Sequence, residues 1–200
     1  VEAYYKQLDD LIVDLGRTDG RVTNDGEGTN VGADMMLTRQ FGDGWSANVT
    51  YSWNRQRLDD NDGAGTYTAD FSRRHFFSAA ARWEISERWQ IGARWKYGSG
   101  RPTDSFVVRE DVLGAGQPVR FAKELIDRNG DRAADYHSLN FRVDYRRPMG
   151  PVDLILFLDV INAYGGPEAA PREFNPRTGT LVASEDEALP LIGFMVERSW

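Results

Sequence analysis

The stretch Trp45-Ser-Ala-Asn-Val-Thr-Tyr-Ser-Trp-Asn54 alternates without exception between apolar and small polar side chains. Its odd positions carry Trp, Ala, Val, Tyr and Trp, and its even positions carry Ser, Asn, Thr, Ser and Asn. Successive side chains of a β-strand point to opposite faces, so the stretch predicts a strand with one apolar face. A Trp near each end of that face is typical of a strand that crosses a bilayer, because aromatic side chains gather at the two headgroup levels.

Seven further segments repeat this pattern. The first loses its rhythm at Asp9-Asp10, the second is broken only by Arg39, and the seventh of the eight is apolar on both faces except at Asp159. The chain therefore predicts eight strands, near residues 1–13, 31–41, 45–54, 77–86, 89–98, 135–146, 154–164 and 190–200.

The connections between these segments alternate in length. Short turns are expected at Gly42–Gly44, at Glu87-Arg88 and at Pro148–Pro151, where Gly, Asp and Pro favour tight turns. Long loops are expected over residues 16–27, 58–72, 104–134 and 165–189. Short turns at one end and long loops at the other predict an all-β fold, a transmembrane antiparallel up-and-down β-barrel, rather than a soluble sandwich.

Composition agrees with this class and excludes others. The 200 residues contain no Cys, which excludes disulfides and thiolate metal sites, and their net charge of -7 argues against a nucleic-acid partner. No run of about 18 apolar residues is present, so no membrane-spanning helix is expected. A mean hydropathy of -0.55 fits a membrane barrel, because only alternate residues of each strand contact lipid.

Five elements of the sequence resemble the carboxy-terminal barrel of the TonB-dependent outer-membrane receptors. They follow the order of that family, and they are Glu2-Ala-Tyr-Tyr5, Gly98-Ser-Gly-Arg-Pro102, Asp135-Tyr-His-Ser-Leu-Asn-Phe-Arg-Val143, Leu156-Phe-Leu-Asp-Val-Ile-Asn162 and the ending from Leu189 to Trp200.

The resemblance implies a place in the outer membrane of a Gram-negative bacterium and uptake of a scarce nutrient, such as a ferric siderophore, cobalamin or an oligosaccharide. It implies that these strands are the last eight of roughly 22. A plug domain, its TonB-contacting segment and about fourteen earlier strands would then lie outside this chain, which we expect to be part of a longer one because Val1 follows no recognisable leader.

Charged residues at the alternate strand positions that form the polar face are candidates for contact with the plug. Charges inside a barrel persist where water or a partner satisfies them, so these residues either pair with one another or contact the plug. They are Asp34, Arg82, Glu84, Arg94, Lys96, Arg142, Asp144, Arg146 and Asp159.

The last segment has a further expected role. Its apolar parity carries Ile192, Phe194, Val196 and Trp200, and by resemblance this strand is the signal for the barrel-assembly machinery. Arg198 has the same parity and departs from the apolar pattern of the family.

The long loops are acidic, as residues 59–70 show with four Asp and no basic residue. An acidic rim can be solvated by water or bridged by divalent cations to lipopolysaccharide phosphates, so outer-membrane lipid and lipopolysaccharide are expected partners. Asp127, Asn129 and Asp131 resemble the first half of a calcium loop, but the Gly and the bidentate Glu that complete such a loop are lacking. A turn in an exposed loop is the alternative.

The resemblance implies a receptor for a small-molecule ligand, and the residues themselves predict no enzyme and no cofactor. The two histidines, His75 and His137, have the lipid-facing parity, while Ser138 points to the opposite face, so no Ser/His/Asp arrangement can form on one face. One alternative stays open. Eight strands can also close into a self-sufficient small barrel with a structural, anchoring or adhesion role.

Overall fold

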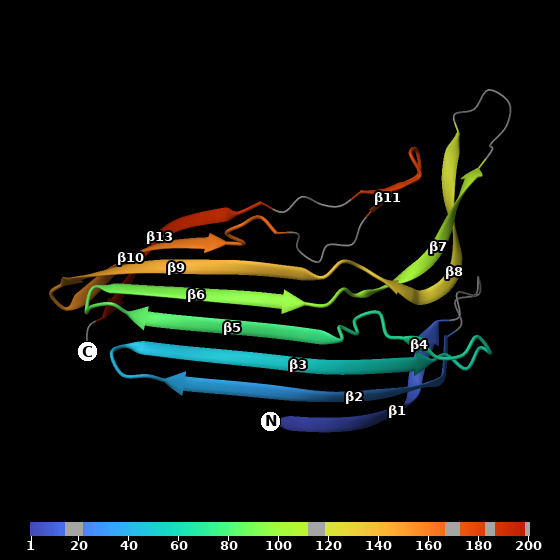
Figure 1. Cartoon of the computed structure of the whole chain (residues 1–200), viewed down its shortest axis with the longest axis horizontal. Helices are drawn as coiled ribbons and strands as arrows, with labels where there is room; N and C mark the ends of the chain where they lie inside the picture. Colours follow the sequence, from blue (N-terminus) through green and yellow to red (C-terminus); the bar gives the residue numbers. More distant parts are fainter. Residues whose placement is uncertain (15–21, 112–118, 167–172, 183–186, 199–200) are drawn as a thin grey trace.

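The computed structural model describes residues 1–14, 22–111, 119–166, 173–182 and 187–198. In these ranges eight strands form an antiparallel meander, which confirms the predicted strand number and fold class (Figure 1). In hydrogen-bonded order they are β1 (Glu2–Asp14), β2 (Val22–Gln40), β3 (Trp45–Asp59), β5 (His75–Glu84), β6 (Trp89–Gly98), β9 (Tyr136–Met149), β10 (Val152–Ile161) and β13 (Leu189–Arg198). Within the same ranges the structure contains no helix long and apolar enough to span a membrane.

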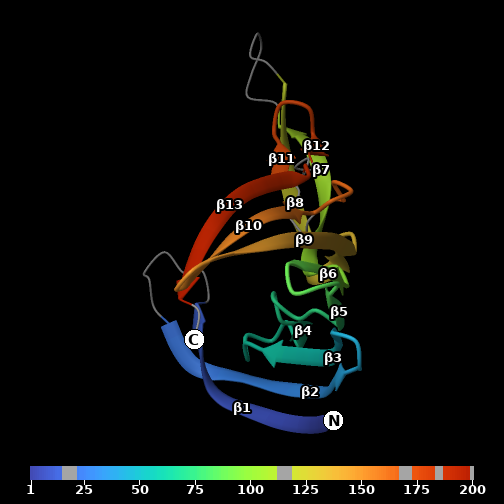
Figure 2. The same cartoon turned by 90° about the vertical axis from the view of Figure 1, so that its left-hand side faces the viewer.

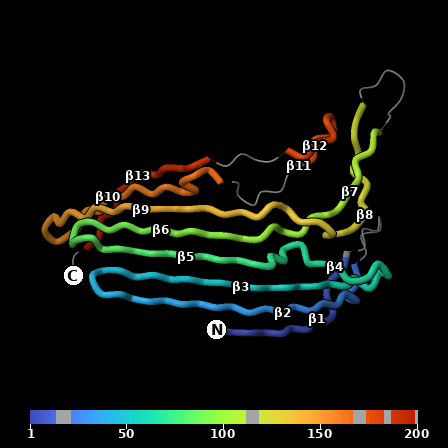
Figure 3. Tube along the Cα trace, viewed as in Figure 1, coloured from blue at the N-terminus to red at the C-terminus, as the bar shows by residue number. Residues whose placement is uncertain are grey.

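The three short turns lie together at one end of the sheet and the long connections lie at the other (Figure 3). The long connections are more regular than predicted. They carry β4 (Tyr67–Thr68), which pairs with β3, a hairpin of β7 (Pro102–Asp111) and β8 (Arg120–Arg132), and a hairpin of β11 (Glu173–Asn175) and β12 (Thr180–Val182).

The prediction of a loop over residues 16–27 is therefore wrong from Val22 onwards, where β2 has begun, and the predicted loop over residues 104–134 is largely the β7–β8 hairpin. A strand that projects beyond the bilayer has water on both faces. It therefore needs no alternation of apolar and polar residues, and the sequence pattern disappears although the strand continues.

Strand register places the alternating apolar residues of neighbouring strands on one face. Trp45 lies opposite Trp83, Val49 opposite Ala79, and Leu37 opposite Val49. The same match continues to the other edge, where Leu156 lies opposite both Tyr145 and Phe194. The sheet thus has one apolar and one polar face.

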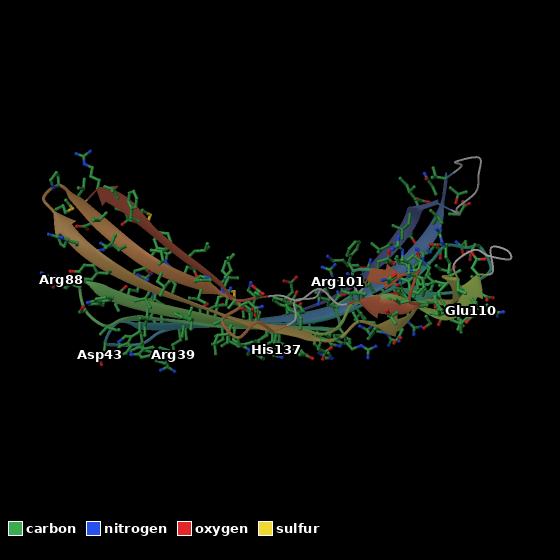
Figure 4. All side chains as sticks on the ribbon, turned by 90° about the horizontal axis from the view of Figure 1, so that it is seen from above. Arg39, Asp43, Arg88, Arg101, Glu110 and His137 are labelled. Carbon is green, nitrogen blue, oxygen red and sulfur yellow. The ribbon has the colours of Figure 1, made fainter. Side chains whose placement is uncertain are left out.

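Protein does not cover the apolar face. Leu37, Ile192 and Phe194 are 62%, 87% and 72% exposed, and no large side chain in the described residues is fully buried. Seen along the strands, the sheet is curved (Figure 2), and Arg39 and His137, which share the apolar parity, lie on its convex side (Figure 4). A convex surface this apolar requires a hydrocarbon surrounding, which is the arrangement of a membrane barrel wall.

Aromatic side chains mark both edges of the apolar band. Near the short turns, the rings of Trp45 and Trp83 stack with centroids 4.7 Å apart, and those of Trp89 and Tyr145 lie 4.8 Å apart. Near the long connections the aromatic tips are polar and hydrogen-bonded. Tyr51 Oη lies 2.8 Å from His75 Nδ1, and Tyr164 Oη lies 2.7 Å from His137 Nδ1. Aromatic rings with one polar end are typical of the headgroup level of a membrane.

Two departures from the alternation have local structural explanations. The break at Asp9-Asp10 is a β-bulge, because the register with β2 shifts between Leu8 and Leu11 and Asp10 has a positive φ of 57°. Arg39 lies at the turn end, where its guanidinium carbon is 4.9 Å from the centroid of the Phe41 ring.

Arg198 also lies at the turn end of the sheet, opposite Val152 at the start of β10. Arg39 and Arg198 thus both lie where a long cationic side chain can reach water. Trp200, the last residue of the expected assembly signal, lies outside the described residues.

A charged residue placed on each face of β3 tests which face meets lipid. Val49 and Thr50 are neighbours in mid-strand on opposite faces. We expect Val49→Arg to lower the free energy of unfolding in lipid vesicles by about 2–4 kcal/mol, because it places a charge at the bilayer midplane, and Thr50→Arg to change it by less than about 1 kcal/mol. Urea unfolding followed by Trp fluorescence measures both. Equal losses in the two variants would contradict the assignment of faces.

Candidate functional site

The polar face gathers all nine charged candidates that the sequence predicts. Register places Arg82 opposite Gly92, Gly92 opposite Arg142, and Arg142 opposite Asp159, in one row across four strands. The others share the face of this row. They are Asp34, Glu84, Arg94, Lys96, Asp144 and Arg146.

Several of these charges form ion pairs within the sheet. Arg82 binds Glu84 at 2.8 Å and Arg142 binds Asp144 at 2.8 Å, each along its own strand. Arg146 of β9 contacts Asp153 of β10 at 3.3 Å and Glu197 of β13 at 3.5 Å, so it links three neighbouring strands. The Arg82 pair is 55% exposed on both sides, so its contribution to stability is small.

Arg94 and Lys96 are the cations among these candidates that stand without a partner in the described residues. In the described part of the chain neither side chain has an ion pair or a hydrogen bond. Their cross-strand neighbours are neutral, with Asn140 opposite Arg94 and Ser138 opposite Lys96. Arg94 also lines a groove of about 510 Å³ on this face. The polar face therefore carries two cations that no carboxylate of the described sheet neutralises.

Near the carboxy-terminal edge an aromatic ring covers a glycine on this face. Phe157 lies opposite Gly193, and a Cβ on Gly193 would collide with its ring. The guanidinium carbon of Arg142 lies 4.2 Å from the centroid of the same ring. Gly193 is thus required for the close approach of Phe157, which in turn supports Arg142.

The other charged region lies beyond the bilayer, where the β7–β8 hairpin rises from the wall (Figure 1). The Gly98–Pro102 motif forms the joint at its base. Gly100 N donates to Asp135 Oδ1 at 2.8 Å, and a Cβ on Gly100 would collide with the carbonyl of Ala133. Tyr97 Oη also donates to Asp135, and this bond, followed by the one from Gly100, lowers the pKa of the carboxyl.

Arg128 and Asn129 of β8 fasten the hairpin to the β3–β5 connection. Arg128 Nη1 lies 2.6 Å from Asp60 Oδ2, and its guanidinium carbon lies 3.8 Å from the centroid of the Tyr67 ring. Asn129 Nδ2 donates to the Thr68 carbonyl at 2.7 Å and to Asp70 at 2.6 Å. We call Asp60, Tyr67, Asp70, Arg128 and Asn129 the loop clamp.

No sequence pattern marks the loop clamp, because its members lie far apart along the chain. Asp60 and Arg128 are separated by 68 residues. Asp60 occurs there only within an acidic loop, and no local pattern marks an ion pair over that distance.

The small β11–β12 hairpin packs against the β7–β8 hairpin. The rings of Phe106 and Phe174 meet edge to face at 6.2 Å, and Lys123 Nζ lies 4.7 Å and 5.3 Å from their centroids. Phe121 N also donates to the Pro176 carbonyl at 2.8 Å. Segments from three connections are therefore joined into one body above the wall.

A cavity of about 640 Å³ opens between these segments. Its charged lining mixes both signs, with Asp70, Asp104 and Asp131 beside Lys123, Arg128 and Arg132. Phe106 and Leu181 add apolar surface. A pocket of this size with a few polar groups of both signs suits a small polar ligand.

The structure places the calcium candidates Asp127, Asn129 and Asp131 in β8, where Asn129 helps to hold the hairpin. Asn129 has a positive φ of 55°, its backbone N donates to Asp104 at 3.0 Å, and its side chain belongs to the loop clamp. Among the described residues there is no group of three or more His, Cys, Asp or Glu side chains suited to a metal ion.

The environment of Tyr67 gives a pH test of the loop clamp. Burial, and then its hydrogen bond to Asp60, raise the pKa of Tyr67 from 10.0 to about 12. Because the folded pKa is raised, the clamp should be intact below about pH 10 and lose stability as the pH rises through about 12.

Ultraviolet titration of phenolate, with Tyr67→Phe subtracted, measures this pKa. Asp60→Asn should bring it back towards 10.0, because it removes the carboxylate that disfavours the phenolate. A Tyr67 that titrates at its ordinary pKa in the unsubstituted protein would contradict the clamp geometry.

One protein family matches most of the chain. Residues 1–163 match the model of the β-barrel described as TonB dependent receptor-like. No curated protein and no solved structure matches the chain.

Proposed function

Since this chain belongs to the TonB-dependent receptor family, we propose that it supplies the carboxy-terminal wall of a nutrient importer and much of its ligand-binding surface. Membership of the family establishes the general activity, which is transport, but not the ligand. The protein acts in the outer membrane of Gram-negative bacteria in TonB-dependent transport, and members of the family are transporters, not enzymes.

The proposed wall is the last eight strands of a barrel of roughly 22. In the described sheet, β1 and β13 each have one hydrogen-bonded neighbour and do not pair with each other. An open strand edge in hydrocarbon costs several kcal/mol for each unsatisfied backbone group, so both edges need further strands. This supports a larger barrel, completed by strands outside the chain and holding a plug domain.

The proposed ligand site is the cavity among the loop hairpins. The observation that carries it is the joining of three separate connections into one body around a polar cavity at the long-loop end, which faces outward in such barrels. The loop clamp holds the lining in place, which lowers the entropy cost of binding. A ferric siderophore, cobalamin or an oligosaccharide is the proposed kind of ligand.

The proposed contact with the plug uses Arg94 and Lys96, which have no ion pair in the described sheet. A cation facing a barrel interior is stabilised by water or by a carboxylate of whatever fills the lumen. The paired candidates, such as Arg82 with Glu84, are satisfied within the wall and need no contact with the plug.

The self-sufficient small barrel remains the second candidate, since the described residues contain eight strands in one meander. It requires β1 to pair with β13. Cysteine pairs placed on β1 and β13 should form no disulfide in outer membranes if the barrel is the larger one. Efficient cross-linking would favour the small barrel.

Nutrient uptake by cells that carry the full-length gene tests the proposed function. Cells that depend on the gene for one of the three nutrient classes should accumulate that labelled nutrient only when TonB is active.

Arg128→Gln should weaken ligand binding roughly tenfold, because it releases the hairpin from Asp60 and Tyr67. Arg109→Gln removes an exposed ion pair with Glu124 on the same hairpin and serves as the matched control.

Uptake that continues without TonB would contradict the proposal. Equal ligand binding by the Arg128 and Arg109 variants would contradict the site.

The plug contact makes a separate prediction in the same cells. Arg94→Gln/Lys96→Gln should reduce the rate of uptake several-fold, because it removes both free cations that a plug carboxylate can bind. Arg82→Gln/Glu84→Gln removes an internal pair together and should leave the rate unchanged. Folded protein is compared by the mobility shift of unheated samples. An unchanged rate in the first variant would rule out the role in plug contact.

A further inference from the structure

Two arginines lie on the same face of β3 as its apolar residues, beyond the aromatic band. Arg55 and Arg57 follow Trp53 at steps of two residues, so they share the convex face. Both are exposed. Their cross-strand neighbours on β2 are Val31 and Thr29, which carry no charge. The convex face thus presents two adjacent cations just past the aromatic row.

Neither cation has a neutralising partner in the described part of the chain. Among the residues that the structure describes, Arg55 and Arg57 have no ion pair and no side-chain hydrogen bond. Arg39, the lipid-facing arginine at the opposite end of the sheet, instead lies over the ring of Phe41. Two free guanidinium groups on one face are well suited to phosphate, which Arg binds with two parallel hydrogen bonds.

The height of the two arginines matches a headgroup layer. Trp53 lies opposite His75, whose ring nitrogen is hydrogen-bonded to Tyr51 in the upper aromatic row. Arg55 lies about 7 Å and Arg57 about 13 Å further along the strand, and strand tilt reduces both heights. The headgroup layer on each side of the hydrocarbon is roughly 5–8 Å thick. Arg55 is therefore level with this layer, and the side chain of Arg57 can reach down to it.

From this position we propose that Arg55 and Arg57 bind the phosphate groups of lipopolysaccharide, the phosphorylated glycolipid of the outer leaflet. The leaflet follows from the fold, because the long-loop end of an outer-membrane barrel faces outward. The chain has a net charge of -7, and its acidic loops repel anionic lipid. A cationic pair at this level offsets the repulsion and favours lipopolysaccharide, whose sugars carry the phosphate groups, as the neighbour of β3.

Binding of purified lipopolysaccharide to the full-length protein in mild detergent tests the proposal. Arg55→Gln/Arg57→Gln should weaken binding roughly thirtyfold, the effect expected for two charges near an anionic lipid surface. Arg39→Gln/Arg147→Gln also removes two cations from the convex face, but at the turn end, and should leave binding unchanged. Arg55→Lys/Arg57→Lys keeps the charge and should fall between these results.

Three probes identify the chemistry that is recognised. Intact lipopolysaccharide should bind the unsubstituted protein tightly, whereas dephosphorylated lipopolysaccharide and phosphatidylglycerol should bind as weakly as intact lipopolysaccharide binds the double Gln variant. Equal losses in the Arg55/Arg57 and Arg39/Arg147 variants would overturn the proposal. Equal affinity for phosphatidylglycerol would also overturn it, because the site would then attract any anionic lipid. If the double Gln variant does not assemble, the single variants Arg55→Gln and Arg57→Gln give the same comparison, each with about a fivefold loss.

Discussion

The structure depends on one constraint, the cost of an unpaired backbone group in hydrocarbon. No water can satisfy an N–H or C=O inside a bilayer, so each strand must bond to neighbours along its whole membrane span. The register from β1 to β13 meets this requirement over most of the described sheet, but β1 begins opposite Asp34, so residues 35–40 of β2 pair with β3 alone. The same pairing fixes which side chains share a face, and so a single register separates lipid contacts from lumen contacts.

The two ends of the molecule follow different rules because the constraint stops at the membrane surface. At the short-turn end the strands reverse within a few residues, and Trp45 and Trp83 close the apolar band. At the long-loop end β7 and β8 leave the wall and are held by side chains, with Arg128 on Asp60 and Lys123 on two phenylalanines. The proposed ligand site therefore lies where lipid no longer dictates the residue pattern.

This difference explains how much of the structure the sequence could predict. All eight wall strands and the common face of the nine charged residues followed from alternation, because lipid on one side forces a period of two. The hairpin from Pro102 to Arg132 gave no such signal, since it lies beyond the bilayer, where no lipid imposes a period of two on either face. The pairing of Asp60 with Arg128 spans 68 residues and needs coordinates. The arginines that broke the pattern, Arg39 and Arg198, proved to lie at the turn end of the sheet.

The central claim is that the odd positions of β3 face lipid and the even positions face the lumen. The chain has no cysteine, so single cysteines at residues 45–54 can each carry a spin label in the membrane-embedded protein. Collision rates with oxygen, which partitions into lipid, and with a water-soluble nickel complex measure the surroundings of each label. The account predicts oxygen maxima at Ala47, Val49 and Tyr51 and nickel maxima at the residues between them. Rates that vary smoothly along the strand, without a period of two, would contradict it.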